Sequence, residues 1–409
     1  LDGKSPAPND FKGKYCTAFF NSSPSVGILL RAGVCVPESC GWEVAMGYAQ
    51  VLLPELGITD IDVVFAQCSE EREYSAGDIA AIVILSLFCL LSILGTVTDL
   101  TFPVDEDQKN GLRSITAVRL ILCFSWWTHG KKLLSAKPSN GQLGCLNGLR
   151  TISMFWVILG HAALFSLRWS KNLIGTFLEL WGTFEFQAIA NADFSVDTFF
   201  FLSGLLVCYL TMKAFSKHSP LKPQFWGMFY FHRFWRLTPV YMLCLMFGTT
   251  LMLHIPSGPG ARELDDGTEV CEKYWWTNLL YINNFHPYDG DNGLTCFTHS
   301  WYLANDMQFF VLSPIIMLLL HYFWIGGLVF SFLLIAGSVI ATGILADKYK
   351  ILPDQLLVGD AAWWNTQFYV RPYFRFVPYL VGLIIGWTLI KFKKGAIGTN
   401  YTIYCVVKF

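Results

Sequence analysis

Charged residues are scarce in this sequence. Lys, Arg, Asp and Glu make up 14% of the 409 residues, whereas soluble globular proteins carry about 25%. Hydrophobic residues make up 54%, and the mean hydropathy is +0.44. The formal net charge of -1 shows no basic excess of the kind that marks a nucleic-acid-binding surface. The composition therefore indicates an integral membrane protein and gives no reason to expect a nucleic-acid partner.

The sequence also lacks the features expected at the two ends of a complete chain. The sequence starts at Leu1 without an initiator Met or a signal peptide, and it stops at Phe409 inside an apolar run. We therefore expect a fragment of a longer chain. Aromatic residues, by contrast, are abundant at 16%, which suits a protein with aromatic belts at the membrane surface.

The first 76 residues form a polar segment with its own cysteine pattern. Four cysteines allow three pairings, and the sequence chooses none of them: Cys16, Cys35, Cys40 and Cys68. A zinc site is the alternative, but the absence of a CxxC motif and of a nearby His favours disulfides. Asn21 begins a glycosylation sequon, which fits an oxidising compartment. We predict a disulfide-stabilised extracytosolic domain over residues 1–76.

The rest of the chain contains long apolar runs. A membrane-crossing helix needs roughly 20 mostly apolar residues. Seven segments meet this condition, and an eighth begins near Thr402: 79–98, 149–167, 196–212, 228–253, 301–321, 323–345 and 368–390. The run 115–128 is shorter and contains Arg119, so we expect an interfacial or re-entrant segment. The predicted fold class is an all-α polytopic membrane protein, part of a larger bundle, with a first span and linker over 77–148 and a main transmembrane domain over 149–409.

The distribution of Lys and Arg predicts the orientation. The connections 101–148 and 213–227 and the segment after the seventh span are rich in these residues, and the alternate connections are poorer. Because basic residues favour the cytosolic side, we place the N-terminus in the lumen or outside the cell, in the secretory pathway or plasma membrane. The loop 255–300 then lies on that same side, so Cys271 and Cys296 are predicted to form a further disulfide.

Some predicted spans contain ionisable residues, which are expensive in a membrane and usually functional. Arg150 and His161 are eleven residues apart, close to three helical turns, so they share one helix face and lie about 16 Å apart along its axis. Arg233 and Arg236 lie one turn apart at the cytosolic end of the fourth span. With Arg150 they make a site for a phosphate-rich ligand, because guanidinium pairs bidentately with phosphate. Anchoring at the membrane surface is the alternative for the arginines, and an interhelical hydrogen bond is the alternative for His161.

Two carboxylates begin spans on the outer side. Asp197 and Asp306 are expected within a turn or two of the depth of His161. A carboxylate beside a histidine orients the ring and raises its basicity, whereas a helix cap or a water contact is the alternative. Arg371 and Arg375 of the seventh span are candidate partners for these carboxylates.

Four motifs occur in order along the spans: Arg150-x10-His161, Phe-Phe-Leu-Ser203-Gly204, Arg233-x-x-Arg236-Leu-x-Pro239-x-Tyr241 and Trp301-Tyr302-Leu-x-x-Asp306-x-Gln308. Together they resemble the membrane acyltransferase family 3. The N-terminal cysteine module, with its Cys35-Val-Pro37-x-Ser39-Cys40 stretch, resembles that of the animal nose-resistant-to-fluoxetine subfamily.

The resemblance implies an enzyme that moves an acyl group from cytosolic acyl-CoA to a hydroxyl of a lipid, a sterol-like molecule or a carbohydrate. It makes His161 the general base, and the family often has Glu where this chain has Asp306. We predict Asp306 and, from its place at the start of a span, Asp197 as catalytic carboxylates. Acyl-CoA would bind Arg150, Arg233 and Arg236. The acceptor pocket is expected to include Ser203, Tyr241, Trp301, Tyr302 and Gln308. No GxSxG motif is present, so we expect direct transfer without a covalent intermediate. We also expect no metal cofactor.

Two other functions fit the same residues. A transporter or lipid-handling protein for hydrophobic compounds would keep the acyltransferase fold and use the same polar residues to line a pathway. A receptor or scaffold would instead bind a partner through the cysteine-rich domain.

Overall fold

The computed structural model describes residues 13–21, 29–55, 62–68, 73–102, 115–135, 144–168, 179–180, 182–255, 268–286, 296–350 and 365–393. The chain divides into two compact units. The first comprises residues 1–140 and 241–269, and the second comprises residues 141–240 and 270–409. Each unit is described on its own.

The N-terminal part of the first unit is a small antiparallel sheet with one helix. Strands β1 (Gly13–Asn21), β2 (Leu29–Pro37) and β3 (Asp62–Cys68) pair in the order β2-β1-β3, and α1 spans Trp42–Glu55. The β1–β3 register places Cys16 opposite Cys68, and these two residues form a disulfide. The sequence indicated this polar, disulfide-stabilised domain, but the sheet itself was not predicted.

Only one disulfide forms among the four N-terminal cysteines, which corrects the expectation for Cys35 and Cys40. Val34 and Val36 of β2 are buried, and Cys35 between them is exposed. Successive strand residues point to opposite faces, so Cys35 faces away from the layer that contains Cys16. Cys40 follows in the turn after β2 and is also unbonded.

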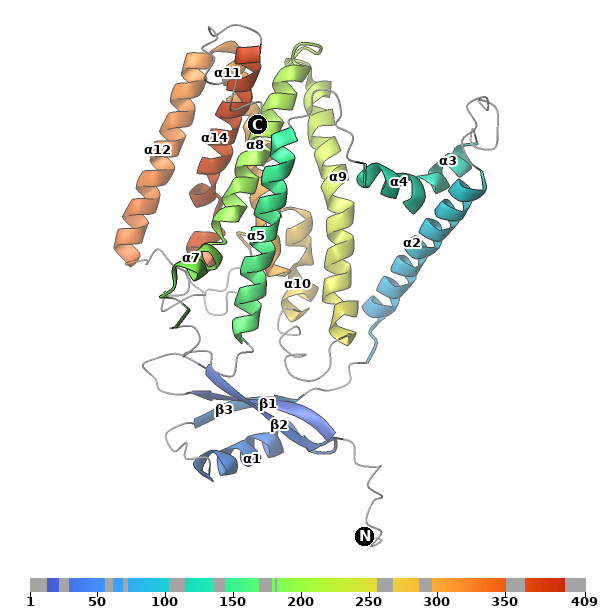
Figure 1. The fold of residues 1–409 in the computed structure, drawn as a ribbon, viewed down its shortest axis with the longest axis vertical. Helices are drawn as coiled ribbons and strands as arrows, with labels where there is room; N and C mark the ends of the chain where they lie inside the picture. The colour runs from blue at the N-terminus through green and yellow to red at the C-terminus, as the bar shows by residue number, and fades with distance from the viewer. Residues whose placement is uncertain are drawn as a thin grey trace. The chain divides into compact units, whose positions relative to one another are not determined.

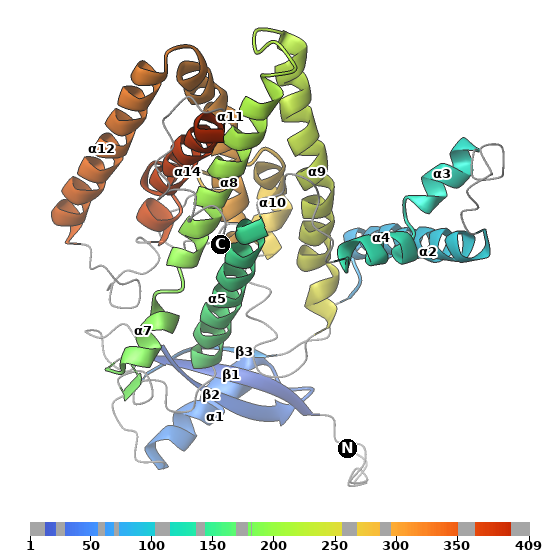
Figure 2. The same cartoon turned by 45° about the horizontal axis from the view of Figure 1, so that its top comes forward.

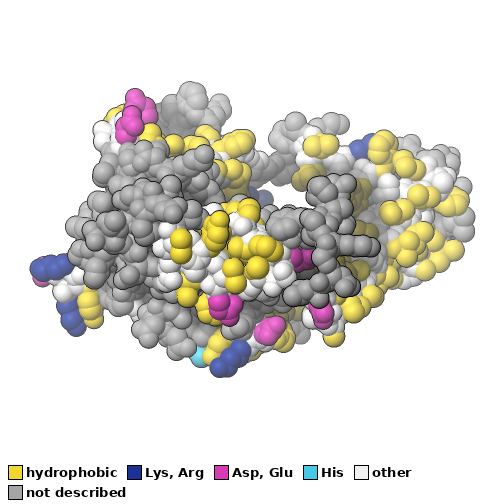
Figure 3. Space-filling view, turned by 90° about the horizontal axis from the view of Figure 1, so that it is seen from below, with side chains coloured by type: hydrophobic (Ala, Val, Ile, Leu, Met, Phe, Trp, Pro, Cys, Tyr) yellow, Lys and Arg dark blue, Asp and Glu magenta, His cyan; other side chains and the backbone are white. Residues whose placement is uncertain are grey.

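The first unit also contains one long apolar helix and two short ones. Helix α2 (Ala76–Thr101) starts with a capping box in which Ser75 and Asp78 bond each other's backbone N–H groups. Most of its apolar side chains are exposed, and Figure 3 shows hydrophobic side chains over the right-hand part of the molecule, where α2 lies. A long helix with such a surface fits contact with lipid.

The predicted interfacial run folds as two helices too short to cross a membrane. Helix α3 spans Thr116–Leu122, and α4 spans Trp126–Leu133. Both contact α2, where the buried Asp99 accepts hydrogen bonds from Ser125 (2.6 Å) and Thr128 (2.5 Å). The carboxylate therefore holds the start of α4 against α2.

The second unit is helical. Its described elements are α5 (Gly144–Arg168), α7 (Phe184–Ala190), α8 (Phe194–Ala214), α9 (Pro223–Thr249), α10 (Thr268–Leu279), η4 (Thr298–Ser300), α11 (Trp301–Tyr322), α12 (Trp324–Tyr349), η6 (Asn365–Tyr369) and α14 (Pro372–Lys393). Helix α9 continues into the first unit, where η2 (Leu251–His254) follows it. Figures 1 and 2 both show α8 between α5 and α14.

Six helices in the described part of the chain are long and apolar enough to cross a membrane, so this is a multi-pass membrane protein. The sequence predicted seven such spans there. The remaining predicted span, 149–167, corresponds to α5, a helix of 25 residues that is not among the six. The eighth predicted span, near Thr402, lies outside the described residues.

Helices α8 and α14 are in close backbone contact at three glycines. A Cβ at Gly204 would lie 2.2 Å from the Tyr379 carbonyl oxygen, and one at Gly382 would lie 2.2 Å from the Phe201 carbonyl oxygen. Gly386, four residues beyond Gly382, makes a similar approach to Leu205. This small-xxx-small spacing lets two helices pack closely in a membrane, where hydrophobicity does not drive helices together.

Replacing Gly382 with Leu is therefore expected to separate α8 from α14 and to lower the free energy of unfolding by about 1–3 kcal/mol or more. The matched control is Gly337→Leu on α12, because a Cβ at Gly337 meets nothing within 4 Å. Thermal unfolding of both variants in the same detergent measures the difference. Equal melting temperatures for the two variants would show that the close α8–α14 approach contributes no stability.

Candidate active site

A large cavity lies within the second unit, mainly between α8 and α9. Its volume is about 1070 Å³. Helices α8 and α9 supply most of the lining, α5 adds Arg150, and α11 adds Tyr302 and Phe310. The predicted residues Arg150, Arg233 and Arg236 thus line a single space, although they come from two helices that are far apart in the sequence.

Arg233 and Asp306 form an ion pair in the wall of this cavity. The Ser203 hydroxyl donates to the second oxygen of Asp306 at 2.6 Å, and the Arg233 guanidinium lies 3.4 Å from the Ser203 oxygen. The side chain of Asp306 is 10% exposed and that of Arg233 is 18% exposed. Asp306 therefore neutralises Arg233 and holds it in place, together with the Phe310 ring, 4.3 Å from the guanidinium carbon.

Arg233 lies deeper than the sequence predicted. It follows the first residue of α9 by ten positions, which is about 15 Å along the helix. Ser203 follows the first residue of α8 by nine positions, about 14 Å from the opposite end of the bundle. The ion pair is thus near the middle of the two spans rather than at the cytosolic end, which explains why Arg233 needs a carboxylate partner.

Arg150 and Arg236 differ from Arg233 in their surroundings. Both line the cavity, and both are exposed. Long helical side chains lean toward the N-terminus of their helix, so on α5 and α9 these two extend toward the end of the bundle where α8 meets α9. Tyr302 interacts electrostatically with Arg150, Arg233 and Asp306, and it stacks on Phe200. The cavity therefore combines a fixed, neutralised arginine with two exposed ones.

The second carboxylate, Asp197, pairs with Arg375. Two nitrogen–oxygen distances, 3.1 and 3.3 Å, join them, as expected for one of the two candidate arginines of the seventh predicted span. The other, Arg371, instead donates to the Asn284 carbonyl at 3.1 Å and to Gln367 at 3.0 Å. Each predicted catalytic carboxylate thus has an arginine as its ionic partner.

His161 lies on α5 and is oriented by the helix backbone. Its Nδ1 is 2.9 Å from the Val157 carbonyl oxygen. A carbonyl only accepts, so Nδ1 carries the proton, and in the neutral ring Nε2 is the basic nitrogen. A Cβ at the adjacent Gly160 would lie 2.3 Å from the Ala192 Cβ, so α5 packs closely here against the segment after α7. His299 is near enough to interact electrostatically with His161, a neighbour that sequence reasoning did not single out.

One predicted pocket residue, Gln308, makes hydrogen bonds to the turn that follows α10. Gln308 donates to the Tyr281 carbonyl at 2.8 Å and to Asn284 at 2.7 Å. Tyr281 itself has a left-handed backbone with φ of 57° and bonds Thr238 through its hydroxyl. Burial raises the pKa of Tyr281 above its ordinary value, because the phenolate is poorly solvated there. Gln308 therefore fixes the turn that follows α10.

Two further pocket predictions fall outside the cavity. Trp301 packs edge-on against Tyr369 with ring centroids 5.0 Å apart, and Tyr241 is buried on α9. Neither is among the described lining residues, whereas Ser203 and Tyr302 are. The α8–α9 turn adds lining residues that the sequence did not indicate as functional: His218, Ser219, Lys222 and Gln224. The sequence feature that pointed to them was the basic character of the connection 213–227.

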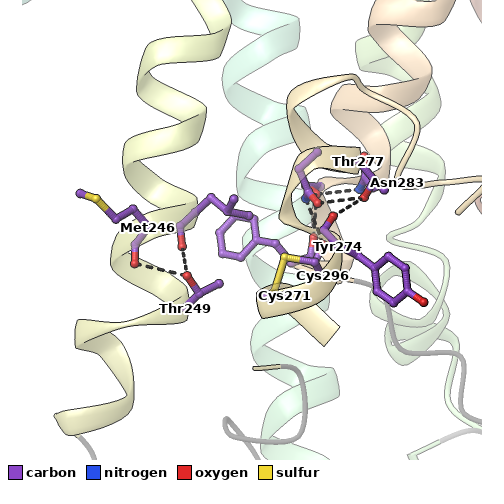
Figure 4. The surroundings of a disulfide bond; sticks show 11 residues. Met246, Thr249, Cys271, Tyr274, Thr277, Asn283 and Cys296 are labelled. Atoms are coloured by element: carbon purple, nitrogen blue, oxygen red, sulfur yellow. Dashed lines mark hydrogen bonds between the residues drawn. A yellow bond between two sulfur atoms is a disulfide. The ribbon is translucent and has the colours of Figure 1, made fainter. Parts of the chain in front are cut away.

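The predicted Cys271–Cys296 disulfide is present. Figure 4 shows it beside Tyr274 and Thr277 of α10. Asn278 donates to the Cys296 carbonyl at 3.0 Å, and both Asn278 and Asn283 donate to the Ser300 hydroxyl. The disulfide and these amides fix the segment that leads into α11. Both disulfides fit an extracytosolic location.

Comparison with known proteins supports the order of motifs. A family model described as an acyltransferase domain matches residues 143–400. The chain belongs to the acyltransferase 3 family. The matched region contains His161, the arginines of the cavity and the Arg233–Asp306 pair.

The proteins that this chain is similar to have different names. "Nose resistant to fluoxetine protein 6" of Caenorhabditis elegans is 32% identical over 88% of this chain and 47% of its own length. "Regulator of hypoxia-inducible factor 1" of the same organism is 25% identical over 70% of this chain and 59% of its own length. A protein of Staphylococcus aureus, named as a proposed O-acetyltransferase, is 25% identical over 61% of this chain and 35% of its length. The chain thus spans about half the length of the curated relatives it matches. No solved structure matches it.

Proposed function

We propose that this protein transfers an acyl group from acyl-CoA to a hydroxyl acceptor. The observation that carries the proposal is the cavity in which Arg150 and Arg236 are exposed beside the neutralised Arg233. Exposed guanidinium groups suit the phosphates of coenzyme A, because each makes paired hydrogen bonds to phosphate oxygens. The relatives named as O-acetyltransferases support the same reaction class.

In the proposed reaction His161 acts as the general base. Its Nε2 accepts the proton of the acceptor hydroxyl while the hydroxyl oxygen attacks the thioester carbonyl. The carbon–sulfur bond then breaks, and the coenzyme A thiolate leaves and takes up the proton from His161. The Val157 carbonyl supports this role, because its bond with Nδ1 sets the tautomer that leaves Nε2 basic.

The carboxylates have a different role in this proposal from the one that the sequence indicated. Asp306 fixes Arg233 and the Ser203 hydroxyl in the cavity wall, and Asp197 fixes Arg375 at the start of α8. Both act as positioning residues. An ion pair lowers the cost of placing charged groups inside a span. The Arg233–Asp306 pair also keeps the polar wall beside the acyl donor in one conformation.

The proposal is tested with the purified full chain in lipid nanodiscs and acyl-CoA labelled in its acyl group. A mixture of lipid, sterol and carbohydrate acceptors is offered, and labelled products are separated by chromatography. We expect a labelled ester and stoichiometric release of free coenzyme A. Hydrolysis without an ester, or no turnover with any donor chain length, would count against an acyltransferase.

Transport of hydrophobic compounds is the second candidate, favoured by the apolar middle of the cavity. Leu206, Val207 and Met228 line it between its polar parts. In liposomes containing the protein, uptake of a hydrophobic amine in the absence of acyl-CoA, with no acylated product, would favour this function. Uptake that requires acyl-CoA and yields an ester would favour acyl transfer over transport.

A further inference from the structure

We infer that the α8–α9 turn is a binding subsite for the 3′-phosphate end of acyl-CoA, a step that rests on the proposed acyl transfer. The turn lies at one end of the cavity. His218, Ser219 and Lys222 of the turn and Gln224 in the first turn of α9 are lining residues. This polar group is separate from Arg233, since Ala214 follows Ser203 by eleven positions of α8, about 16 Å along the helix.

The charges that line the cavity are of one sign. Lys222 and the three arginines are cationic, and no Asp or Glu is among the described lining residues. The carboxylate of Asp306 lies behind the lining and is already engaged by Arg233. A long cavity with cations at both ends and no competing carboxylate suits a ligand with separated anionic groups.

The order of residues along the cavity sets the direction of the ligand. The turn residues His218 and Lys222 are exposed, whereas Ser203 and Tyr302 at the other end are partly buried. Moving a phosphate into a membrane interior is costly, so the nucleotide stays at the exposed mouth. The diphosphate then lies toward Arg150 and Arg236, whose side chains extend toward this mouth, and the less polar thioester arm is directed along Leu206, Val207 and Met228 toward Ser203 and Tyr302. The basic 213–227 connection is predicted to be cytosolic, which is the side where acyl-CoA is available.

The turn has a defined conformation. The Trp226 indole donates to the Pro220 carbonyl at 2.8 Å, and the Lys222 amide donates to the Ser219 carbonyl at 3.3 Å. Phe215 packs against Phe225 and Trp226 with ring centroids 5.6 and 6.0 Å apart. These contacts brace the backbone on both sides of Lys222, so its side chain starts from a fixed position. A subsite held in this way loses less entropy when a ligand binds.

The test compares coenzyme A with dephospho-coenzyme A, which lacks only the 3′-phosphate. Binding of each is measured to the full chain in nanodiscs of neutral lipid for the wild type, H218Q/K222Q and K217Q. Lys217 is the matched control, because it is exposed on the same turn but does not line the cavity. We expect H218Q/K222Q to weaken coenzyme A binding about tenfold, the effect of a charge-assisted hydrogen bond, and to leave dephospho-coenzyme A binding unchanged. K217Q is expected to bind both as the wild type does.

The outcomes separate this inference from the proposed function. Failure of the wild type to bind either nucleotide would overturn the proposed function, and the subsite with it. Wild-type binding of coenzyme A with no difference between H218Q/K222Q and K217Q would overturn the subsite alone. A lipid phosphate is the other possible source of the same chemistry, so binding is repeated in nanodiscs containing phosphatidic acid. Phosphatidic acid binding that depends on His218 and Lys222, with coenzyme A binding independent of them, would assign the turn to lipid and contradict the inference.

Discussion

Replacing His161 with Ala is expected to lower the rate of acyl transfer by about 10²–10⁴-fold, the usual contribution of a well-placed general base. The affinity for acyl-CoA is expected to stay within about twofold, because His161 is not among the described lining residues of the cavity. The loss should therefore appear in kcat rather than in KM for the donor. Steady-state kinetics with labelled acyl-CoA measure both.

The control for this prediction is Leu159→Ala, which truncates an exposed side chain two residues away on α5. It is expected to retain kcat, since it removes no proton acceptor. Undiminished transfer by the His161 variant would remove the general-base role. An equal loss in both variants would instead point to a disturbed α5.

Replacing Asp306 with Ala is expected to destabilise the protein by about 3–5 kcal/mol, because it leaves Arg233 without a counter-charge near the middle of the span. The Ser203 hydroxyl also loses its acceptor. Thermal unfolding in detergent measures the loss. Acyl transfer should fall as well, since the wall of the cavity is no longer fixed.

The double variant R233M/D306L separates charge burial from the loss of a contact. It removes both charges and replaces them with apolar side chains, so its stability should approach that of the wild type. Its acyl transfer should stay low, because the positioned guanidinium is absent. If the double variant were as unstable as Asp306→Ala, the pair would contribute through packing rather than through the compensation of charge.

The sequence predicted much of the framework because the relevant signals are local. Five of the six candidate spans correspond to predicted spans that begin within a few residues of the helices. The sixth, Pro223–His254, consists of α9 and η2 and contains the predicted run 228–253. Cys271 and Cys296 were paired correctly. They are the two cysteines of the loop 255–300, which was predicted to lie on the extracytosolic side. The N-terminal sheet was missed. Its buried residues, such as Cys16 and Ala18, are small and alternate over a short distance, which gives a weak strand signal.

The partners of the charged residues could not be predicted in the same way. Asp306 and Arg233 are 73 residues apart, and Asp197 and Arg375 are 178 residues apart. Sequence patterns proposed arginine partners for the carboxylates, but Asp306 pairs with Arg233 rather than with Arg371 or Arg375. Which arginine lies opposite which carboxylate depends on how helices from separate segments are packed and rotated. The glycine contacts between α8 and α14 are part of that packing.

The sequence by itself determined that this is a multi-pass membrane protein of the acyltransferase 3 family, with His161 and Arg150 on one face of one helix. Those conclusions depend on hydropathy, spacing and ordered motifs, which are properties of the chain read along its length. Only the tertiary structure decided that Arg233 is neutralised by Asp306, that Gln308 fixes a turn, and that the α8–α9 turn opens into the cavity of the arginines. An ion pair or a cavity exists only where separate helices meet, and neither appears in any single segment.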